Sequence, residues 1–283
     1  MAPRASRSPY RDGPSSCAGR RTPPSRARAG NSGDSRNRRN RGNLRNRTAD
    51  LPVAVHMATL GLIGSGQIGS TLARIAVANG LDVVVSNSRG PETLADLVAE
   101  LGPRATAGTP AEAAAAGDWV VVTIPLKAYQ QVPVEPLVGK TVLDTNNYYA
   151  DRDGTLPELE AGTTTSGELL QAHLERSHVV KVFNNIYFQH LAVLSRPKGA
   201  PDRSALPIAG DDAEGKARAV ELLDALGFDA VDAGPLAESW RFGPGTDAYG
   251  RLYAEERDVN FTQRKAAPAQ AAEVTGTLAA ARR

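Results

Sequence analysis

The sequence predicts an α/β protein with a doubly wound, mainly parallel β-sheet and a small C-terminal extension. Three observations support this fold class. Short apolar runs alternate with helix-periodic segments over roughly 175 residues, which is typical of a parallel sheet covered by helices. The runs are continuously apolar, as strands buried on both faces are. A glycine-rich segment, residues 64–69, stands directly between the first apolar run and the first helical pattern.

The expected elements follow in chain order. Strands are expected at residues 60–63, 83–85, 118–124, 141–145, 178–183, 206–210 and 228–231. Helices are expected at residues 70–79, 91–101, 111–116, 168–174 and 212–226. Because Pro207 lacks a backbone N–H, its strand is expected toward a sheet edge. Residues 151–165 look irregular, and the Ala-rich residues 266–283 are compatible with a surface helix or a loose tail.

Composition divides the chain near residue 56. Residues 1–56 hold 13 Arg, three Asp and no Lys or Glu, a charge of about +10, whereas the whole chain carries +2. With almost no apolar residues before Leu51, this leader cannot offset its ordering entropy and is expected to be disordered. The leading interpretation is that Met57 is the true start and the leader is not part of the native protein. A basic arm for polyanions and a transit peptide are the alternatives.

Several classes of protein are excluded by what the sequence lacks. No apolar run approaches the roughly 18–20 residues that span a bilayer, and no secretory signal pattern is present. The single cysteine, Cys17, lies in the leader, so the remainder has no disulfide or thiolate chemistry. No H-x-x-x-H, C-x-x-C or clustered carboxylates indicate a metal. We therefore expect a cytoplasmic protein without membrane contact or metal, whose acidic folded domain does not bind nucleic acid.

The glycine-rich segment lies in a strand–turn–helix unit. Residues 59–70 read T-L-G-L-I-G-S-G-Q-I-G-S, with the spacing G-x-G-x-x-G. Gly64 suits the tight turn, Gly66 lets the backbone approach a pyrophosphate, and Gly69 lets the helix pack closely on the strand. Unpaired N–H groups at the helix start and the helix dipole both favour a phosphate there. The segment therefore predicts a dinucleotide site in a Rossmann-type fold.

The end of the second strand indicates which dinucleotide binds. An NAD site usually has an acidic residue there, about 20 residues past the glycine loop, that accepts bonds from the ribose 2′-OH. Here the chain reads Ser86-Asn87-Ser88-Arg89, with no acid before Glu92. Arg89 can pair bidentately with a 2′-phosphate, and Ser88 can donate a hydrogen bond to it. The sequence therefore favours NADP.

Ligands of open parallel sheets bind beyond the carboxyl ends of the strands. The loop at residues 124–126 is expected beside the nicotinamide, and two Asn pairs follow later strands. These Asn pairs suit the orientation of a carboxamide or a substrate, and they equally suit turns that satisfy local backbone groups. The expected cofactor-binding residues are Gly64, Ser65, Gly66, Gln67, Ile68, Gly69, Asn87, Ser88, Arg89, Ile124, Pro125 and Leu126. The expected substrate residues are Asn146, Asn147, Asn184 and Asn185.

No catalytic side chain is predicted. Among the histidines, His190 is the best candidate because it follows Asn184 by six residues. No G-x-S-x-G or other nucleophile arrangement is present. Hydride transfer between two bound cofactors requires positioning more than proton transfer, so an oxidoreductase can work without a catalytic side chain.

With these motifs in hand, the chain resembles the NADPH-dependent coenzyme F-420 reductase family, in its bacterial dinucleotide-binding branch. The resemblance rests on G-L-I-G-S-G-Q-I-G-S, N-S-R-G-P-E-T-L, V-V-V-T-I-P-L-K-A-Y, L-D-T-N-N-Y-Y and V-K-V-F-N-N-I, and covers about residues 58–241. It implies hydride exchange between NADPH and a deazaflavin. The loop after Asp144, with two Asn and two Tyr, departs from archaeal deazaflavin-binding members.

The sequence thus predicts an NADP-dependent oxidoreductase with F-420 as the favoured partner. Its expected parts are a leader at residues 1–56, an NADP-binding Rossmann-type domain at 57–242 and a partly disordered or helical extension at 243–283. The alternatives are a non-catalytic NADPH-binding sensor and an imine or hydroxy-acid reductase of the pyrroline-carboxylate reductase type. The expected partner is a small-molecule substrate or a deazaflavin, and a homodimer is the assembly to test.

Overall fold

The computed structural model describes residues 58–283, which all lie in one compact unit. The leader expected at residues 1–56 and the proposed start at Met57 lie outside the described residues. Within residues 58–283, no helix is long and apolar enough to cross a membrane.

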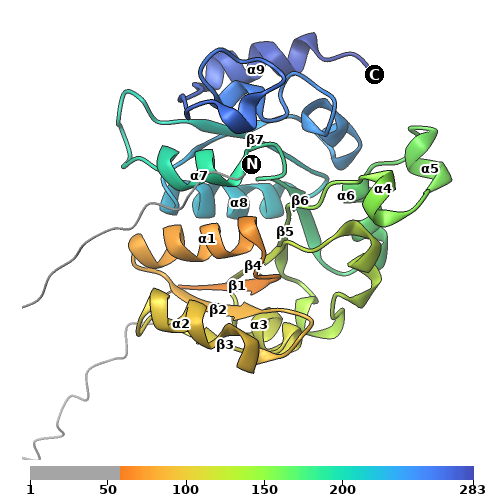
Figure 1. The fold of residues 1–283 in the computed structure, drawn as a ribbon. Coiled ribbons are helices and arrows are strands. Elements are labelled where there is room, and N and C mark those ends of the chain that lie inside the picture. The colour runs from red at the N-terminus through yellow and green to blue at the C-terminus, as the bar shows by residue number, and fades with distance from the viewer. Residues whose placement is uncertain (1–57) are drawn as a thin grey trace, which may run out of the picture. The chain divides into compact units, whose positions relative to one another are not determined.

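The strands of the described residues form one sheet in the order β3-β2-β1-β4-β5-β6-β7-β8 (Figure 1). Their bounds are β1 Thr59–Ile63, β2 Asp82–Ser86, β3 Ala105–Ala107, β4 Trp119–Val122, β5 Thr141–Asp144, β6 His178–Lys181, β7 Ala205–Gly210 and β8 Asp229–Asp232. The first six strands pair in parallel, β7 runs antiparallel to β6, and β8 is parallel to β7. The order 3-2-1-4-5-6 is that of a Rossmann-type doubly wound fold. The predicted fold class is confirmed.

Helices cover both faces of the sheet. Their bounds are α1 Gln67–Ala78, α2 Ala95–Leu101, α3 Pro110–Ala116, α4 Ala150–Asp153, α5 Pro157–Glu160, α6 Ser166–His173, α7 Phe188–Leu194, α8 Ala213–Ala225 and α9 Ala271–Ala280. The 3-10 turns are η1 Pro91–Leu94, η2 Leu126–Gln131, η3 Glu135–Leu137, η4 Leu236–Phe242, η5 Arg251–Tyr253 and η6 Phe261–Gln263.

Two hydrophobic cores separate these helices by face. Successive residues of a strand point to opposite faces. Val121 of β4 accordingly lies in a core with residues of α1, α7, α8 and α9. Its neighbours Val120 and Val122 lie in a second core with residues of α3 and α6. This two-sided burial explains why the strands read as continuous apolar runs.

Some expected elements differ from the observed ones. The expected strand at residues 206–210 is β7, but it is not the sheet edge, because β8 lies outside it. Pro207 is accommodated because β6 pairs only with Ala209 and Gly210, beyond the proline. Residues 151–165 are not wholly irregular, since they include part of α4 and all of α5. Strand β3 and helix α7 have no counterpart in the sequence prediction.

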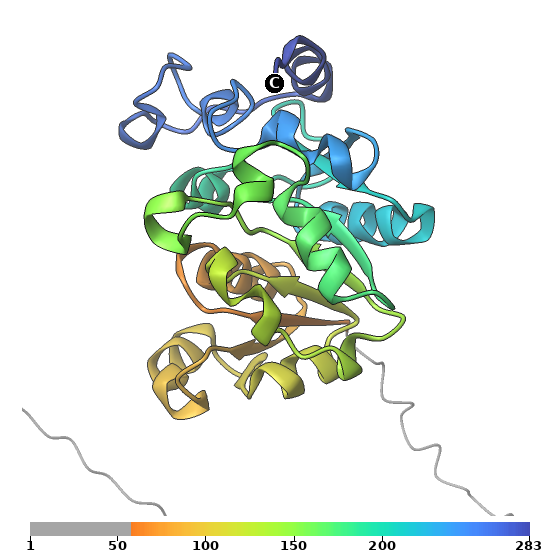
Figure 2. The same cartoon turned by 90° about the vertical axis from the view of Figure 1, so that its right-hand side faces the viewer.

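The residues after 242 belong to the same core as the sheet. Tyr253, Val274 and Leu278 are buried in it, and α9 contacts β7 and β8. Figures 1 and 2 show this segment, in blue, at the same end of the fold as β7. Of the two expectations for residues 266–283, a helix and a loose tail, the ten residues of α9 form the helix. The core that contains the sheet continues past residue 242.

Candidate nucleotide and acceptor site

Two glycines of the loop after β1 are required by the packing. Gly64 has φ +115°, and a Cβ on it would lie 2.0 Å from the carbonyl oxygen of Thr123. A Cβ on Gly69 would lie 2.2 Å from the carbonyl oxygen of Gly64. Both contacts are far below ordinary van der Waals separation, so the tight turn and the close helix packing depend on these glycines.

Gly66 is different, because nothing lies within 4 Å of the place where its Cβ would be. It is exposed and caps α1, and no side chain makes a capping hydrogen bond there. The start of this 12-residue helix is therefore open, with its positive dipole end facing solvent. The space left at Gly66 fits a phosphate approaching the backbone, and the fold itself does not need it.

The loop after β2 presents Arg89 near this opening. The backbone N–H of Arg89 donates to Oδ1 of Asn87 (2.8 Å), and Nδ2 of Asn87 donates to Oγ1 of Thr93 (2.8 Å). Asn87 therefore fixes the loop, while Ser88 and Arg89 remain exposed. Among residues 58–283, no carboxylate is paired with the Arg89 guanidinium.

A groove of about 810 Å³, here called the nucleotide groove, joins these two loops. Of the expected cofactor-binding residues, Gly64, Ser65, Gly66, Asn87, Ser88, Arg89, Ile124 and Pro125 line it. Leu126 does not. It is fully buried at the start of η2 and lines neither this groove nor the cavity beside it, so its contact with the cofactor stays a prediction.

A cavity of about 450 Å³, here called the adjoining cavity, lies beside the groove. Both are lined by Gly66, Thr123, Ile124 and Pro125, so they meet there. Gln67 and Ile68, also expected at the cofactor, line the adjoining cavity. All four expected substrate residues line it as well, together with the aromatic residues Tyr149, Tyr187, Phe188, Tyr249 and Phe261.

The Asn residues are not equivalent. Asn147 and Asn184 bind each other, because Nδ2 of Asn147 donates to the Asn184 carbonyl (2.7 Å) and Nδ2 of Asn184 donates to Oδ1 of Asn147 (3.2 Å). Asn185 is buried, and its Nδ2 donates to the carbonyl oxygen of Ala248 (3.0 Å), which holds the C-terminal segment. Only Asn146 keeps both amide hydrogens without a partner.

A buried ion pair lies beneath Asn146. Lys181, at the end of β6, donates to Oδ2 of Asp144 at the end of β5 (2.9 Å), and the side chains are 2% and 0% exposed. Burial raises the pKa of Asp144 and lowers that of Lys181, while their attraction and hydrogen bond oppose both shifts. Neither residue is among the site residues predicted from the sequence. The available signal was that two charged residues end consecutive apolar strands.

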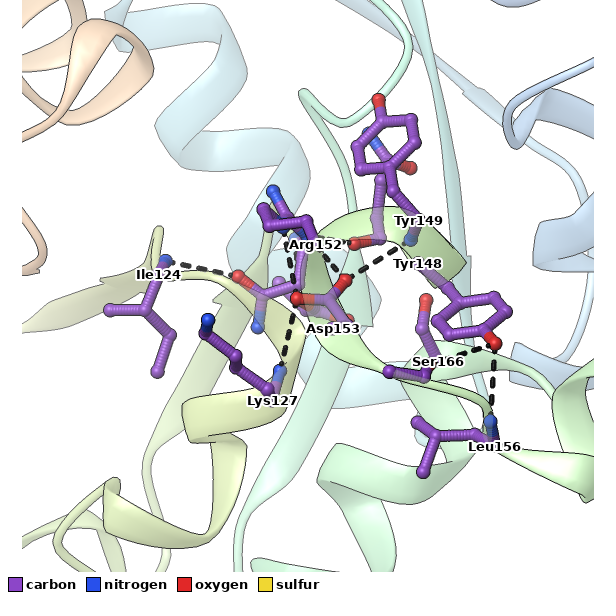
Figure 3. A network of polar contacts seen from close by, with 12 residues as sticks. Ile124, Lys127, Tyr148, Tyr149, Arg152, Asp153, Leu156 and Ser166 are labelled. Atoms are coloured by element: carbon purple, nitrogen blue, oxygen red, sulfur yellow. Dashed lines mark hydrogen bonds and ion pairs between the residues drawn. The ribbon is translucent and has the colours of Figure 1, made fainter.

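Tyr149 and Arg152, which line the adjoining cavity, belong to a network of polar contacts (Figure 3). The Arg152 guanidinium lies 4.9 Å from the ring centre of Tyr149, and its Nη2 donates to the Asn147 carbonyl (2.6 Å). Asp153 accepts hydrogen bonds from Arg152 and from the Tyr149 backbone (3.1 Å). The hydroxyls of Tyr149 and Tyr249 are in hydrogen-bond contact, and burial raises the pKa of Tyr249. This contact joins the loop after β5 to the C-terminal segment.

Two further residues bear on the site. Phe183, directly before Asn184, has φ +60°, an unfavourable conformation for an aromatic residue. No sequence pattern predicts this backbone conformation.

His190 is buried in α7, and its Nε2 lies 3.0 Å from the Arg264 carbonyl oxygen. It therefore helps to hold the C-terminal segment, and it lines neither the nucleotide groove nor the adjoining cavity. Within residues 58–283, no group of three or more His, Cys, Asp or Glu side chains is placed to hold a metal.

The chain is similar in sequence and structure to known proteins described as NADP oxidoreductases. Residues 59–148 match the family described as NADP oxidoreductase coenzyme F420-dependent. The hypothetical protein SMa0349 from Sinorhizobium meliloti is 29% identical, with a TM-score of 0.59 over 67% of this chain and 91% of that one. A protein from Arthrobacter sp. FB24, provisionally described as an F420-dependent NADP-reductase, is 25% identical, with a TM-score of 0.55 over 65% of this chain and 87% of that one.

A longer relative matches the same region. The metalloreductase STEAP3 of Rattus norvegicus is 30% identical over 182 residues, which cover 64% of this chain and 34% of the rat protein. The chain thus spans about a third of the length of this curated relative. Together with the glycine loop and the strand order, these matches assign the nucleotide-binding part of the chain, residues 59–148, to the family of coenzyme F420-dependent NADP oxidoreductases.

Proposed function

We propose that this protein is an NADP-dependent oxidoreductase that transfers hydride between NADP(H) and a second ring, with the deazaflavin coenzyme F-420 as the favoured partner. The observation that carries the proposal is the junction of two cavities at Gly66, Ile124 and Pro125. Ligands in the nucleotide groove and in the adjoining cavity would meet at this junction. Hydride transfer between two bound molecules requires such a meeting point.

The residues of the nucleotide groove fit NADP(H). When bound, NADPH would supply a hydride from its nicotinamide ring. The open start of α1 at Gly66 would hold the pyrophosphate by backbone N–H groups. Arg89, which has no carboxylate partner among the described residues, would pair with the 2′-phosphate beside Ser88. Residues 86–91, from the end of β2 to the residue before Glu92, include no Asp or Glu, which supports NADP over NAD.

The adjoining cavity suits a flat acceptor. Tyr149, Tyr187 and Tyr249, with Phe188 and Phe261, give it an aromatic lining against which a ring can pack. Its one charged lining residue within residues 58–283, Arg152, is already paired with protein groups, since it binds Asp153 and a backbone carbonyl. Reduction of a deazaflavin by NADPH moves one hydride between the two rings, and the one proton that the reduced ring also takes up would come from solvent. The transfer would then need no side-chain acid, so this lining is compatible with deazaflavin chemistry.

The two alternative functions require different structural features. An imine or hydroxy-acid reductase of the pyrroline-carboxylate reductase type needs a long helical domain after the nucleotide-binding unit. Here the chain continues into β7 and β8, which extend the same sheet, and this favours the deazaflavin proposal. A non-catalytic NADPH sensor would share the nucleotide groove, so turnover must separate it from an enzyme.

The test is an anaerobic acceptor screen with NADPH in excess, followed by absorbance. Oxidised F-420 should be reduced by the wild-type protein and not by Gly66→Val, which serves as the control for the nucleotide groove. Free flavin and a ferric chelate are included, the latter because the rat relative is named a metalloreductase. NADPH binding without turnover of any acceptor would favour the sensor. Turnover of a free imine but not of F-420 would overturn the deazaflavin proposal.

A further inference from the structure

The main chain of Asn146 is held on both sides by the buried ion pair. Its N–H donates to Oδ1 of Asp144 (2.8 Å), and its carbonyl oxygen accepts a hydrogen bond from Nζ of Lys181. Nζ also donates to Oδ2 of Asp144 and to Oγ of Ser166, each at 2.9 Å. The three protons of Lys181 and both oxygens of Asp144 are therefore engaged. One bond from each partner goes to the main chain of Asn146.

The side chain of Asn146 has a fixed orientation. Its Oδ1 accepts the backbone N–H of Ile124 at 3.1 Å, the dashed line drawn from Ile124 in Figure 3. An amide flip would place two donors against each other, so Oδ1 must face Ile124. Nδ2 is then the free end. It is buried without a hydrogen-bond partner, on a residue that is 2% exposed and lines the adjoining cavity.

A buried donor without an acceptor is unfavourable by about 1–3 kcal/mol, so its retention calls for an explanation. A ligand carbonyl oxygen in the adjoining cavity would satisfy it. Asn184 lines the same cavity, and its Oδ1 also lacks a partner, while its Nδ2 donates to the Phe242 carbonyl (3.2 Å). The residues that line the cavity thus include one free amide donor, Nδ2 of Asn146, and two free amide acceptors, Oδ1 of Asn184 and Oδ1 of Asn185. A free donor and a free acceptor match the C=O and N–H of an amide group.

The ion pair itself calls for an explanation. Two charges buried together gain little stability over apolar residues of the same size, because their desolvation offsets their attraction. Lys181 and Asp144 do hold one specific loop residue, however, beside the junction of the two cavities. A positioning role accounts for both the burial and the bonds to Asn146.

We propose that Nδ2 of Asn146 binds the amide carbonyl oxygen of a ring that exchanges hydride, and that Lys181 and Asp144 are positioning residues that hold Asn146 for this contact. The inference rests on the proposed function. The amide has two sources with the same chemistry: the carboxamide of nicotinamide and a ring amide of the acceptor.

The experiment compares two ligands that share the 2′-phosphate. NADPH carries the nicotinamide ring, whereas 2′-phospho-ADP-ribose lacks it. In titrations without acceptor, Asn146→Ala should lower the affinity for NADPH by about fivefold to twentyfold, because one hydrogen bond is lost. The affinity for 2′-phospho-ADP-ribose should not change. This result assigns the contact to nicotinamide. An unchanged NADPH affinity with a KM for F-420 raised about tenfold assigns it to the acceptor.

Two outcomes would overturn the contact. One is an equal weakening of NADPH and 2′-phospho-ADP-ribose, which indicates a general structural defect. The other is no change in either affinity or in the KM for F-420. If the wild-type protein binds neither ligand, the proposed function fails. If it binds both and Asn146→Ala changes nothing, only this inference fails.

The positioning role is tested by removing both charges together, since either charge alone would be left buried and unpaired. Asp144→Asn with Lys181→Met should reproduce the selective loss seen for Asn146→Ala. If the double variant folds and keeps the wild-type ligand preference, Lys181 and Asp144 have only a structural role, and the proposed positioning role is overturned. Ser166→Ala, which removes only one acceptor of Lys181, gives a milder second measurement. A smaller loss in the same direction supports positioning, and no loss opposes it.

Discussion

At the scale of single residues, Gly66 separates the requirements of the ligand from those of the fold. A side chain on Gly64 or Gly69 would collide with backbone, whereas a side chain on Gly66 would enter open space. The G-x-G-x-x-G pattern gives all three glycines the same weight. In the structure, Gly64 and Gly69 are needed for folding. Packing does not require a glycine at position 66, so the approach of a ligand is the reason that remains for it.

Gly66→Val should therefore abolish NADPH binding without unfolding the protein. A blocked approach of the pyrophosphate removes about 3 kcal/mol or more of charge-assisted bonds, a loss of about a hundredfold or more in affinity. Calorimetric titration measures the affinity, and thermal melting checks the fold. Gly276→Val is the matched control, since it also adds a side chain in open space, on α9. Retained NADPH affinity in Gly66→Val would refute this placement of the pyrophosphate.

Asp153 gives a pH dependence with a defined sign. Partial burial raises the pKa of this carboxyl, but hydrogen bonds from Arg152 and from the backbone of Tyr149 and Lys127 outweigh it and leave the pKa below its ordinary value of 3.8. A carboxyl whose pKa is lower in the folded state stabilises the fold above its unfolded pKa, and this contribution is lost as pH falls through the folded pKa.

Wild-type protein should accordingly lose more unfolding free energy than Asp153→Asn when the pH is lowered from 5 to about 3. Urea unfolding at several pH values measures the difference, and the other carboxylates cancel in the comparison. Parallel pH profiles for the two proteins would show that Asp153 is not stabilised by these bonds.

The sequence could not rank the four Asn residues, because their chain positions are alike and their partners are distant. Asn184 binds the carbonyl of Phe242, and Asn185 binds that of Ala248, both about 60 residues later in the chain. Which amide keeps a free atom depends on these long-range contacts. The same holds for the pairing of Lys181 with Asp144.

At the scale of elements, patterns with strong local signals predicted the structure best. Helix α8 was expected from its periodicity, and its cap Asp212 accepts the N–H of Gly215 as an N-cap should. Strand β3 has only three residues, Ala-Thr-Ala, without β-branched bulk beyond its threonine. Helix α7 has seven residues and no side-chain cap, so its helicity depends on packing against α1.

Helix α6 begins with a capping box in which Thr165 and Glu168 satisfy each other's backbone N–H groups. Thr165→Ala should lower the unfolding free energy by about 1–2 kcal/mol, since the buried cap also donates to the Leu236 carbonyl. Urea unfolding measures this. Thr275→Ala, on the exposed side of α9, is the control and should change stability by less than about 0.5 kcal/mol. An equal loss of unfolding free energy in the two variants would show that the capping box adds no stability beyond that of an exposed threonine.

At the scale of the whole molecule, the C-terminal segment is the part that sequence patterns described least well. Its residues 243–270 lack the periodicity of helices or strands, yet Tyr253 is fully buried and its hydroxyl donates to the Ala205 carbonyl (3.0 Å). Single polar contacts of this kind, made across about 50 residues, leave no periodic signal. The parallel sheet, by contrast, was predictable because each strand is marked by its own apolar run.

A chain of residues 57–242 should therefore fail to fold. It loses Tyr253, Val274 and Leu278, and truncating a single buried side chain of this size removes about 2–5 kcal/mol from a total stability of about 5–15 kcal/mol. A chain of residues 57–283 should keep the melting temperature and NADPH affinity of the full chain. Circular dichroism and thermal melting compare the three proteins. Cooperative melting of residues 57–242 would show that the segment is an appendage.

We expect the nucleotide groove to bind NADP(H), with the 2′-phosphate held by Arg89. Calorimetric titration of wild-type protein and Arg89→Ala with NADPH and NADH tests it most directly, with Arg176→Ala, an exposed arginine paired with Glu135, as control. Wild-type protein should prefer NADPH, and Arg89→Ala should weaken NADPH by about tenfold to a hundredfold, the loss of a charge-assisted bond, while changing NADH by less than about twofold. Equal weakening of both dinucleotides, or a wild-type preference for NADH, would contradict this expectation.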